Sequence, residues 1–225
     1  MLVKFRVRDN LRFLSHAEMV KVLERACVRG GIQVQYSQGF NPHPRLSLPL
    51  PRSVGVESDD ELLCLRIDKS VRAQEHKSIE AQEHRRIGGL CSSIKTKLSE
   101  QLPEGLELVS AGVGRGVPQP RLATYLLEVR SEYVNERLKA RTGALLACES
   151  LEVQRQTDHK RAKLKNVDVR GFLKSIELDD NNIEVKCKVS SAGTIRVDEI
   201  LRLLELDVAK LAGPIRRTNV EWEEG

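Results

Sequence analysis

Polar and apolar residues alternate along some segments of the chain, and short leucine-rich runs occupy others. Both patterns are typical of β-strands. Elsewhere apolar residues recur every three or four positions, which predicts amphipathic helices. For the first half, we predict helices over 15–31 and 76–102 and strands over 3–8, 32–36, 61–67 and 106–113.

The second half repeats this order of elements without recognisable sequence identity to the first half. A run of turn-forming residues from Asp179 to Asn182 separates two alternating segments, which predicts a hairpin. We predict helices over 131–150 and 197–206 and strands over 124–130, 151–156, 172–178, 183–189 and 215–222.

The first predicted helix carries start and stop signals. Ser15 and Glu18 have the spacing of a capping box, and Gly30 and Gly31 supply a stop. The second predicted helix begins with a near-duplication, AQEHKSIE followed by AQEHRRIG at 73–88. We interpret this duplication as a lengthening of an exposed helix.

The order β-α-β-β-α-β, met twice, predicts an α+β protein made of two tandem ferredoxin-like units with antiparallel sheets. The segment 115–121 is rich in proline and glycine and is interpreted as a linker. We therefore expect an N-terminal domain over 1–115 and a C-terminal domain over 120–225. The alternative is a single mixed α+β domain.

Several classes of protein are not supported by the sequence. The chain has 225 residues, no apolar stretch long enough to span a membrane, and no apolar leader at its N-terminus. The five cysteines are widely scattered and form no Cys-x-x-Cys pair. Phosphate-loop, dinucleotide-binding, zinc-protease and iron–sulfur motifs are all absent. We expect a cytoplasmic protein with no metal, no cofactor and no membrane partner.

Positive charge is concentrated at the start of the chain. Residues 1–56 contain nine Lys or Arg against three Asp or Glu, whereas the remainder contains 28 against 29. This asymmetry favours a polyanionic partner such as nucleic acid. Aromatic residues make up only 4% of the chain, which disfavours a platform for stacked bases.

The first predicted helix carries a basic stripe. Lys21, Arg25 and Arg29 follow each other at four-residue spacing and share one face. Neighbouring segments add Arg6, Arg8, Arg12, Arg45 and Arg52. The alternative is an ordinary solvated helix face, part of whose charge is neutralised by Glu24.

Two histidines are candidate acid–base groups. His16 stands in the first turn of the predicted helix, next to its unsatisfied backbone amides. His43 lies between Pro42 and Pro44 in a kinked loop, where the prolines limit its backbone freedom. In the same loop, Phe40 is expected to be a core plug rather than a stacking ring. The alternative role of the loop is to protect a sheet edge.

These features together predict a binding site for phosphate groups. Asp168 has the alternative of pairing with Arg170 or capping a turn. The predicted ligand-binding residues are Arg12, Ser15, Lys21, Arg25, Arg29, Ser37, Gln38, Gly39, Asn41, Arg45, Lys165, Asp168 and Arg170.

Three short motifs stand in order in the first quarter of the chain: RFLSH (12–16), YSQGFNPHP (36–44) and LPRSVGVES (50–58). With them, the chain resembles the radical SAM-linked protein family, whose members are free-standing or fused behind radical SAM enzymes. Weaker similarity extends over LPEGLEL, KNVDVR and IRRTNV. The resemblance implies a companion to radical SAM chemistry in RNA or ribosome modification. Because this chain lacks the cluster motif Cys-x-x-x-Cys-x-x-Cys, it cannot run that chemistry itself.

Three functional hypotheses follow. The first is an accessory protein that binds transfer or ribosomal RNA, or another phosphate-rich ligand, for a radical SAM enzyme. The second is a structural partner of such an enzyme without nucleic-acid binding. The third is a metal-independent endoribonuclease that uses His16 and His43, since the predicted fold is similar in outline to the CRISPR-repeat endoribonucleases.

Overall fold

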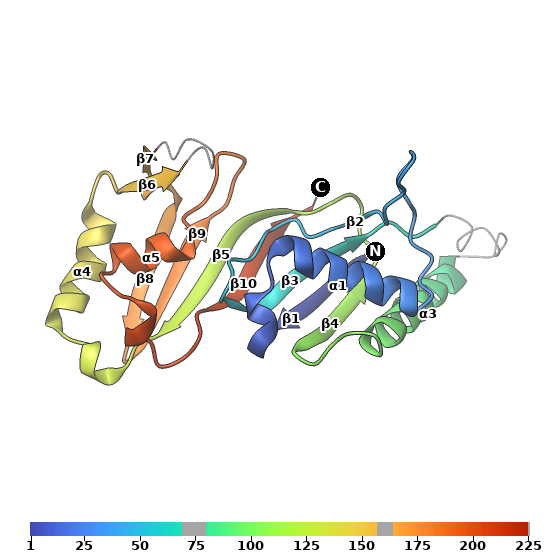
Figure 1. Cartoon of the computed structure of the whole chain (residues 1–225), viewed down its shortest axis with the longest axis horizontal. Helices are drawn as coiled ribbons and strands as arrows, with labels where there is room; N and C mark the ends of the chain where they lie inside the picture. Colours follow the sequence, from blue (N-terminus) through green and yellow to red (C-terminus); the bar gives the residue numbers. More distant parts are fainter. Residues whose placement is uncertain (69–79, 157–163, 225) are drawn as a thin grey trace. The chain divides into compact units, whose positions relative to one another are not determined.

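A computed structural model describes residues 1–68, 80–156 and 164–224 (Figure 1). The chain forms two compact units, Met1–Gln119 with Glu223–Gly225, and Pro120–Trp222. Each unit combines helices with a mostly antiparallel sheet, so the predicted α+β class is confirmed. Within the described ranges, no helix is both long and apolar enough to cross a bilayer.

The first unit contains a sheet in which β1 lies between β4 and β3, and the short β2 pairs with β3. All of these pairings are antiparallel. The elements are β1 (Leu2–Val7), η1 (Asp9–Phe13), α1 (His16–Arg29), β2 (Leu46–Ser47), β3 (Glu57–Leu65), α3 (Glu80–Ser99) and β4 (Leu106–Gly112).

The core of the first unit follows from the residue patterns. Alternate residues of β1 are fully buried, and α1 turns one apolar face into the same cluster. Leu98 of α3 joins this cluster. Gly30 marks the end of α1 beside α3, since a Cβ atom at this position would lie 3.1 Å from the Lys97 carbonyl oxygen.

Two strand predictions in this unit differ from the structure. Segment 32–36 forms only isolated bridges, from Val34 to Ile67 and from Tyr36 to Pro44. Prolines lack the N–H group that would extend a ladder, so the proline-rich segment after Tyr36 forms only the two-residue strand β2. Strand β3 begins at Glu57 rather than at 61, and its added residues are polar.

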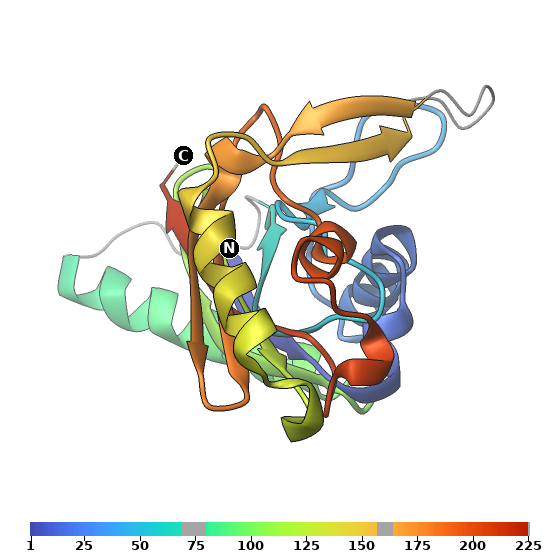
Figure 2. The same ribbon diagram turned by 90° about the vertical axis from the view of Figure 1, so that its left-hand side faces the viewer.

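The second unit contains a sheet in the order β10-β5-β9-β8, with a separate two-stranded β6–β7 hairpin (Figure 2). The hairpin predicted across Asp179–Asn182 is confirmed as β8 and β9. The elements are β5 (Gln119–Glu128), η2 (Ser131–Tyr133), α4 (Glu136–Ala147), β6 (Glu152–Gln156), β7 (Leu164–Asp168), η3 (Arg170–Phe172), β8 (Leu173–Asp179), β9 (Asn182–Lys188), α5 (Val197–Leu203), η4 (Val208–Lys210) and β10 (Arg216–Glu223).

Two elements of this unit also differ from the prediction. Strand β7 was not predicted. The helix expected over 131–150 is shorter, because Asn135 accepts a hydrogen bond from the Leu138 N–H and thereby caps α4. In the first unit, the helix predicted over 76–102 is observed as α3, Glu80–Ser99. Most of the first copy of the AQEH duplication lies outside the described residues.

A buried ion pair fixes the hairpin to α5 within the second unit. Arg155 Nε donates to Glu199 Oε1 at 2.7 Å, and its Nη2 donates to the Thr194 carbonyl oxygen at 2.7 Å. Burial acts to raise the pKa of Glu199, but hydrogen bonds from Arg155 and from the Arg196 N–H lower it overall. The pair is therefore ionised and serves to anchor β6.

Candidate functional site

Cations of β1 contact carboxylates of β3. The pairing register of the two strands shifts between Phe5 and Val7, as in a β-bulge. Opposite this irregularity, Asp59 and Asp60 both contact cations of β1. Lys4 Nζ lies 2.8 Å from Asp60 Oδ1.

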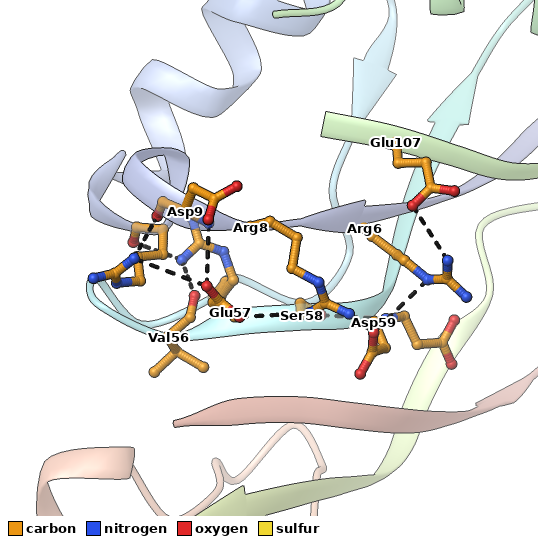
Figure 3. A network of polar contacts seen from close by, with 11 residues as sticks. Arg6, Arg8, Asp9, Val56, Glu57, Ser58, Asp59 and Glu107 are labelled. Atoms are coloured by element: carbon orange, nitrogen blue, oxygen red, sulfur yellow. Dashed lines mark hydrogen bonds and ion pairs between the residues drawn. The ribbon is translucent and has the colours of Figure 1, made fainter. Parts of the chain in front are cut away.

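Two arginines extend this ion-pair network (Figure 3). Arg6 contacts Asp59 (Nε–Oδ1, 3.7 Å) and Glu107 of β4 (Nη1–Oε2, 3.2 Å). Arg8 pairs with Asp59 and lies 3.7 Å from the Glu57 carboxylate (Nη1–Oε2), whose side chain is only 9% exposed. The positive charge of β1 is therefore largely neutralised by its neighbouring strands.

Arg12 belongs to the same network. Its Nη1 donates to the Asp9 carbonyl oxygen at 2.9 Å and lies 3.8 Å from Glu57 Oε1. Its guanidinium also stacks over the Phe13 ring, 4.5 Å from the ring centre. The residue predicted to bind phosphate thus already has a carboxylate partner.

Arg52 holds the backbone around η1. Its Nη1 donates to the Arg12 carbonyl oxygen at 2.7 Å and also to that of Val56. Its Nη2 donates to the carbonyl oxygens of Leu11 and Leu14 at 3.2 and 3.3 Å. Because these bonds join segments distant in the sequence, the role of Arg52 is structural.

The start of α1 is occupied by a carboxylate of the chain itself. The Ser15 hydroxyl donates to Glu18 Oε2 at 2.7 Å, and the Ser15 N–H donates to the same oxygen at 2.8 Å. The Glu18 N–H returns a bond to Ser15 Oγ at 3.3 Å, so the predicted capping box is confirmed. The Ser15 hydroxyl, followed by its N–H, lowers the pKa of Glu18. This geometry gives Ser15 a capping role where a phosphate was predicted.

A small cavity lies next to Ser15 and His16. Its volume is about 10 Å³. Its other lining residues are Val7, Leu14, Met19, Leu48, Leu50, Arg52 and Glu61. A single water molecule requires roughly 10–15 Å³, so a nucleotide does not fit here.

The basic stripe lies on the solvent side of α1. Lys21, Arg25 and Arg29 are all exposed. Within the described ranges, Lys21 and Arg25 form no hydrogen bond or ion pair through their side chains, and Glu24 pairs with neither. Arg29 donates to Gln101 after α3, with Nη2 at 2.7 Å from the carbonyl oxygen. The stripe therefore keeps positive charge that faces solvent.

The segment 36–45 forms a braced loop. The Ser37 N–H donates to the His43 carbonyl oxygen at 2.8 Å, and the His43 N–H donates to Ser37 Oγ at 3.0 Å. At its tip, Gly39 has a φ of +132°, which favours glycine, and Gln38 and Asn41 are exposed. The Arg45 N–H donates to the Gln35 carbonyl oxygen, while its side chain is exposed.

The prediction that Phe40 is a core plug is wrong. Its relative exposure is 113%, the highest among the exposed large apolar residues of the described part. The backbone bonds between the two sides of the loop hold the loop in place, so the ring is not needed underneath. Phe40 therefore points into solvent.

The two candidate catalytic histidines stand on different elements. His16 is the first residue of α1 and lines the small cavity. His43 lies in the braced loop that follows the other end of α1 and is not among the residues lining that cavity. The two imidazoles therefore do not line the same small cavity.

Two of the three ligand residues predicted in the second unit, Asp168 and Arg170, have structural partners. Asp168 Oδ1 accepts hydrogen bonds from the N–H groups of Leu151 and Arg170, both at 2.9 Å, and these bonds lower its pKa. Arg170 Nη2 donates to the Leu146 carbonyl oxygen of α4 at 2.7 Å. Lys165 is exposed on β7.

In the part of the chain that the structure describes, no group of His, Cys, Asp or Glu side chains is placed to hold a metal ion. The five cysteines are free. Burial raises the pKa of Cys27 to about 11 and that of Cys187 to about 12, so these thiols are protonated near neutral pH.

The carboxylates that neutralise the cations of β1 were not predicted from the distribution of charge along the sequence. The basic block ends at Val56, and the acidic run ESDDE begins at the next residue. Alternation of the cations with Val3, Phe5 and Val7 in β1 was the signal that these charges share one sheet face. This alternation did not predict which strand would pair with β1 and supply carboxylates to its cations.

Comparison with known protein families identifies one that covers most of the chain. A family model described as "Uncharacterized protein conserved in bacteria (DUF2344)" matches residues 1–198. No curated protein matches the sequence. The family match covers the whole basic stripe, the braced loop and the ion-pair network.

Proposed function

The chain belongs to the uncharacterised bacterial family DUF2344, and because the family description states no activity, we propose a function from the geometry: an accessory protein that binds RNA. The contact surface in this proposal is the exposed side of α1 together with the loop 36–45. The ligand is a phosphate-rich RNA segment, from transfer or ribosomal RNA.

One observation carries the proposal. In the first unit, the cations of β1 and Arg8 are paired with carboxylates. Lys21 and Arg25 of α1 face solvent and form no ion pair with a described residue, although the charge of Lys21 adds to the larger effect of the Ser15 hydrogen bonds in lowering the pKa of Glu18. A polyanion gains most from cations whose charge is not already neutralised. Arg45 adds a further exposed cation in the adjacent loop.

The salt dependence of RNA binding tests this proposal. The probes are a 20-nucleotide oligouridylate and unfractionated transfer RNA, measured by fluorescence anisotropy over a range of salt concentrations. Each phosphate contact contributes about −0.7 to the slope of log K against log salt concentration for single strands. We expect the double variant Lys21→Gln, Arg25→Gln to bind more weakly and to lose up to about 1.4 of that slope on oligouridylate.

A matched control comes from the second unit. Lys174 and Lys188 are exposed lysines of β8 and β9 with no side-chain partner in the described residues. The variant Lys174→Gln, Lys188→Gln removes the same number of charges and is expected to leave the slope unchanged. Equal losses in both variants, or RNA binding that does not respond to salt, would contradict the proposal.

We also propose that each unit is ferredoxin-like. The support is the strand pairing within each unit. In the first unit β1 lies between β4 and β3, and the short β2 also pairs with β3; in the second unit the order is β10-β5-β9-β8. The second unit then carries the β6–β7 hairpin as an insertion before β8. An experimental structure with two helices on the same face of each sheet would agree, and helices on opposite faces would not.

The partner in this proposal is a radical SAM enzyme that modifies the bound RNA. Its support is the sequence resemblance carried by the motifs of residues 12–58. Affinity purification of the tagged protein, with and without ribonuclease, tests the partner. Recovery of such an enzyme without any RNA affinity would favour the structural-partner hypothesis, and RNA cleavage lost in His16→Ala would favour the endoribonuclease.

A further inference from the structure

The loop 36–45 presents an aromatic ring at its tip. The bridge between Tyr36 and Pro44 and the two hydrogen bonds between Ser37 and His43 tie the sides of the loop together. Prolines at 42 and 44 restrict the backbone further. In Figure 1 this segment extends from the first unit next to β2. The tip is therefore held in place without any contribution from Phe40.

Phe40 is exposed without a benefit to folding. A phenylalanine side chain stabilises a fold when it is buried, so the fully exposed Phe40 leaves that stabilisation unused. A single exposed apolar residue is common on protein surfaces. Here, however, a braced loop holds the ring out, which is typical of a side chain positioned to contact a ligand.

The exposed aromatic residues are unevenly distributed. The chain has one tryptophan, three tyrosines and four phenylalanines. Of these, Phe13, Tyr36 and Phe40 are exposed in the first unit, at 55%, 49% and 113%. Phe13 precedes α1 in the chain, and the other two follow it. The basic stripe is thus flanked in sequence by exposed rings.

Exposed rings and solvent-facing cations within one unit suit a particular ligand. Proteins that hold single-stranded nucleic acid combine a positively charged surface for the backbone with aromatic rings on which bases stack. In a duplex the base faces are already covered by neighbouring base pairs, so an exposed ring has nothing to stack on. A protruding phenylalanine therefore suits an unpaired base better than a duplex.

We propose that Phe40 stacks on an unpaired base and that the ligand of the α1 surface is therefore single-stranded RNA. This inference rests on the proposed function, because the cations of α1 supply the electrostatic part of binding. The low aromatic content of the chain, 4%, favours the opposite conclusion. The decisive quantity is the exposure of the rings and not their number.

The test compares single-stranded and duplex RNA. The probes are a 20-nucleotide oligouridylate and the same strand annealed to oligoadenylate. Stacking of one base contributes about 1–3 kcal/mol, so Phe40→Ala should weaken binding of the single strand by about 5-fold or more and leave duplex binding unchanged. Phe40→Trp should retain binding of the single strand, and its fluorescence should be quenched on binding.

Matched controls separate this inference from the proposed function. Tyr133→Ala removes an exposed aromatic ring from the second unit and should have no effect on either probe. If Phe40→Ala bound the single strand as tightly as the native protein does, or lost affinity equally for the single strand and the duplex, the stacking role would be overturned. The salt slope of the Lys21→Gln, Arg25→Gln variant still reports on the proposed function in that case. Loss of a copurifying protein in Phe40→Ala, with RNA affinity intact, would overturn the inference in favour of a protein partner.

Discussion

Two sets of cationic side chains in the first unit differ in their surroundings. The cations of β1 and the turn after it, including Arg6 and Arg8, are paired with carboxylates of β3 and β4. Those of α1, Lys21 and Arg25, remain in solvent without ion-pair partners among the described residues. The comparison shows that an excess of basic residues along a sequence does not locate a basic surface.

The difference arises from the geometry of the two elements. A strand places its polar residues opposite those of its neighbours, so cations on β1 meet whatever β3 and β4 carry at the same level. A helix on the outside of a sheet turns its polar face to solvent and meets no strand there. We therefore expect changes in the network to affect folding and changes in the stripe to affect binding.

The largest expected effect on stability is that of Glu57→Gln. The nearly buried Glu57 carboxylate accepts a hydrogen bond from the Asp9 N–H at 3.1 Å and lies near Arg8 and Arg12. Losing its charge leaves those arginines without one partner, so we expect the free energy of unfolding to fall by about 2 kcal/mol. Urea unfolding followed by circular dichroism measures the loss, and hydrogen exchange of β1 peptides assigns it to the first unit.

The matching change in the stripe should have little effect. We expect Lys21→Gln, Arg25→Gln to change the free energy of unfolding by less than about 0.5 kcal/mol, as is usual for exposed substitutions. If this variant were as unstable as Glu57→Gln, the distinction between a folding network and a binding stripe would fail.

An effect on stability between these two is expected for Ser15→Ala, because Ser15 at the start of α1 contributes to folding rather than to binding. Loss of the N-cap should lower the free energy of unfolding by about 1 kcal/mol. Because the backbone and side chain of Ser15 are already bonded to Glu18 in the capping box, we expect Ser15→Ala to bind oligouridylate with the same affinity as the native protein. A large loss of RNA affinity with unchanged stability would instead return Ser15 to the ligand site.

The smallest expected effect is the contribution of Glu18 to the pH dependence of stability. Its pKa lies below the ordinary value of about 4.5 in the folded protein, so its ionised form stabilises the fold. That contribution is complete above pH 4.5 and is lost as the pH falls through the lowered pKa. The difference in unfolding free energy between the native protein and Glu18→Gln should therefore shrink on acidification. A difference that is constant from pH 7 to pH 3 would exclude a role for this charge.

Much of the fold could be predicted from local patterns. The helix from His16 to Arg29 follows from its apolar period and its capping signals, which involve residues close in the sequence. The β8–β9 hairpin follows from two alternating segments around a turn. Strand β3 was predicted too short because Glu57 to Asp60 are polar, and polar residues form a strand there only because β1 supplies their partners.

The candidate site was less predictable. The positions of Lys21 and Arg25 on one helix face follow from their spacing. The exposure of Phe40 does not, since an aromatic residue in a proline-rich loop suits a plug as well as a protruding ring. The structural use of Asp168 depends on the Leu151 N–H, 17 residues away in the chain.

The sequence by itself determined the α+β class, the start and end of α1 and the stripe of cations along it, because these depend on residue periodicity and on contacts within a few residues. Only the tertiary structure decided that the charges of β1 are neutralised and that Phe40 is exposed. Net charge at a surface and exposure of a ring depend on which distant segments pack together, and strand pairing across some fifty residues is not encoded in any local pattern.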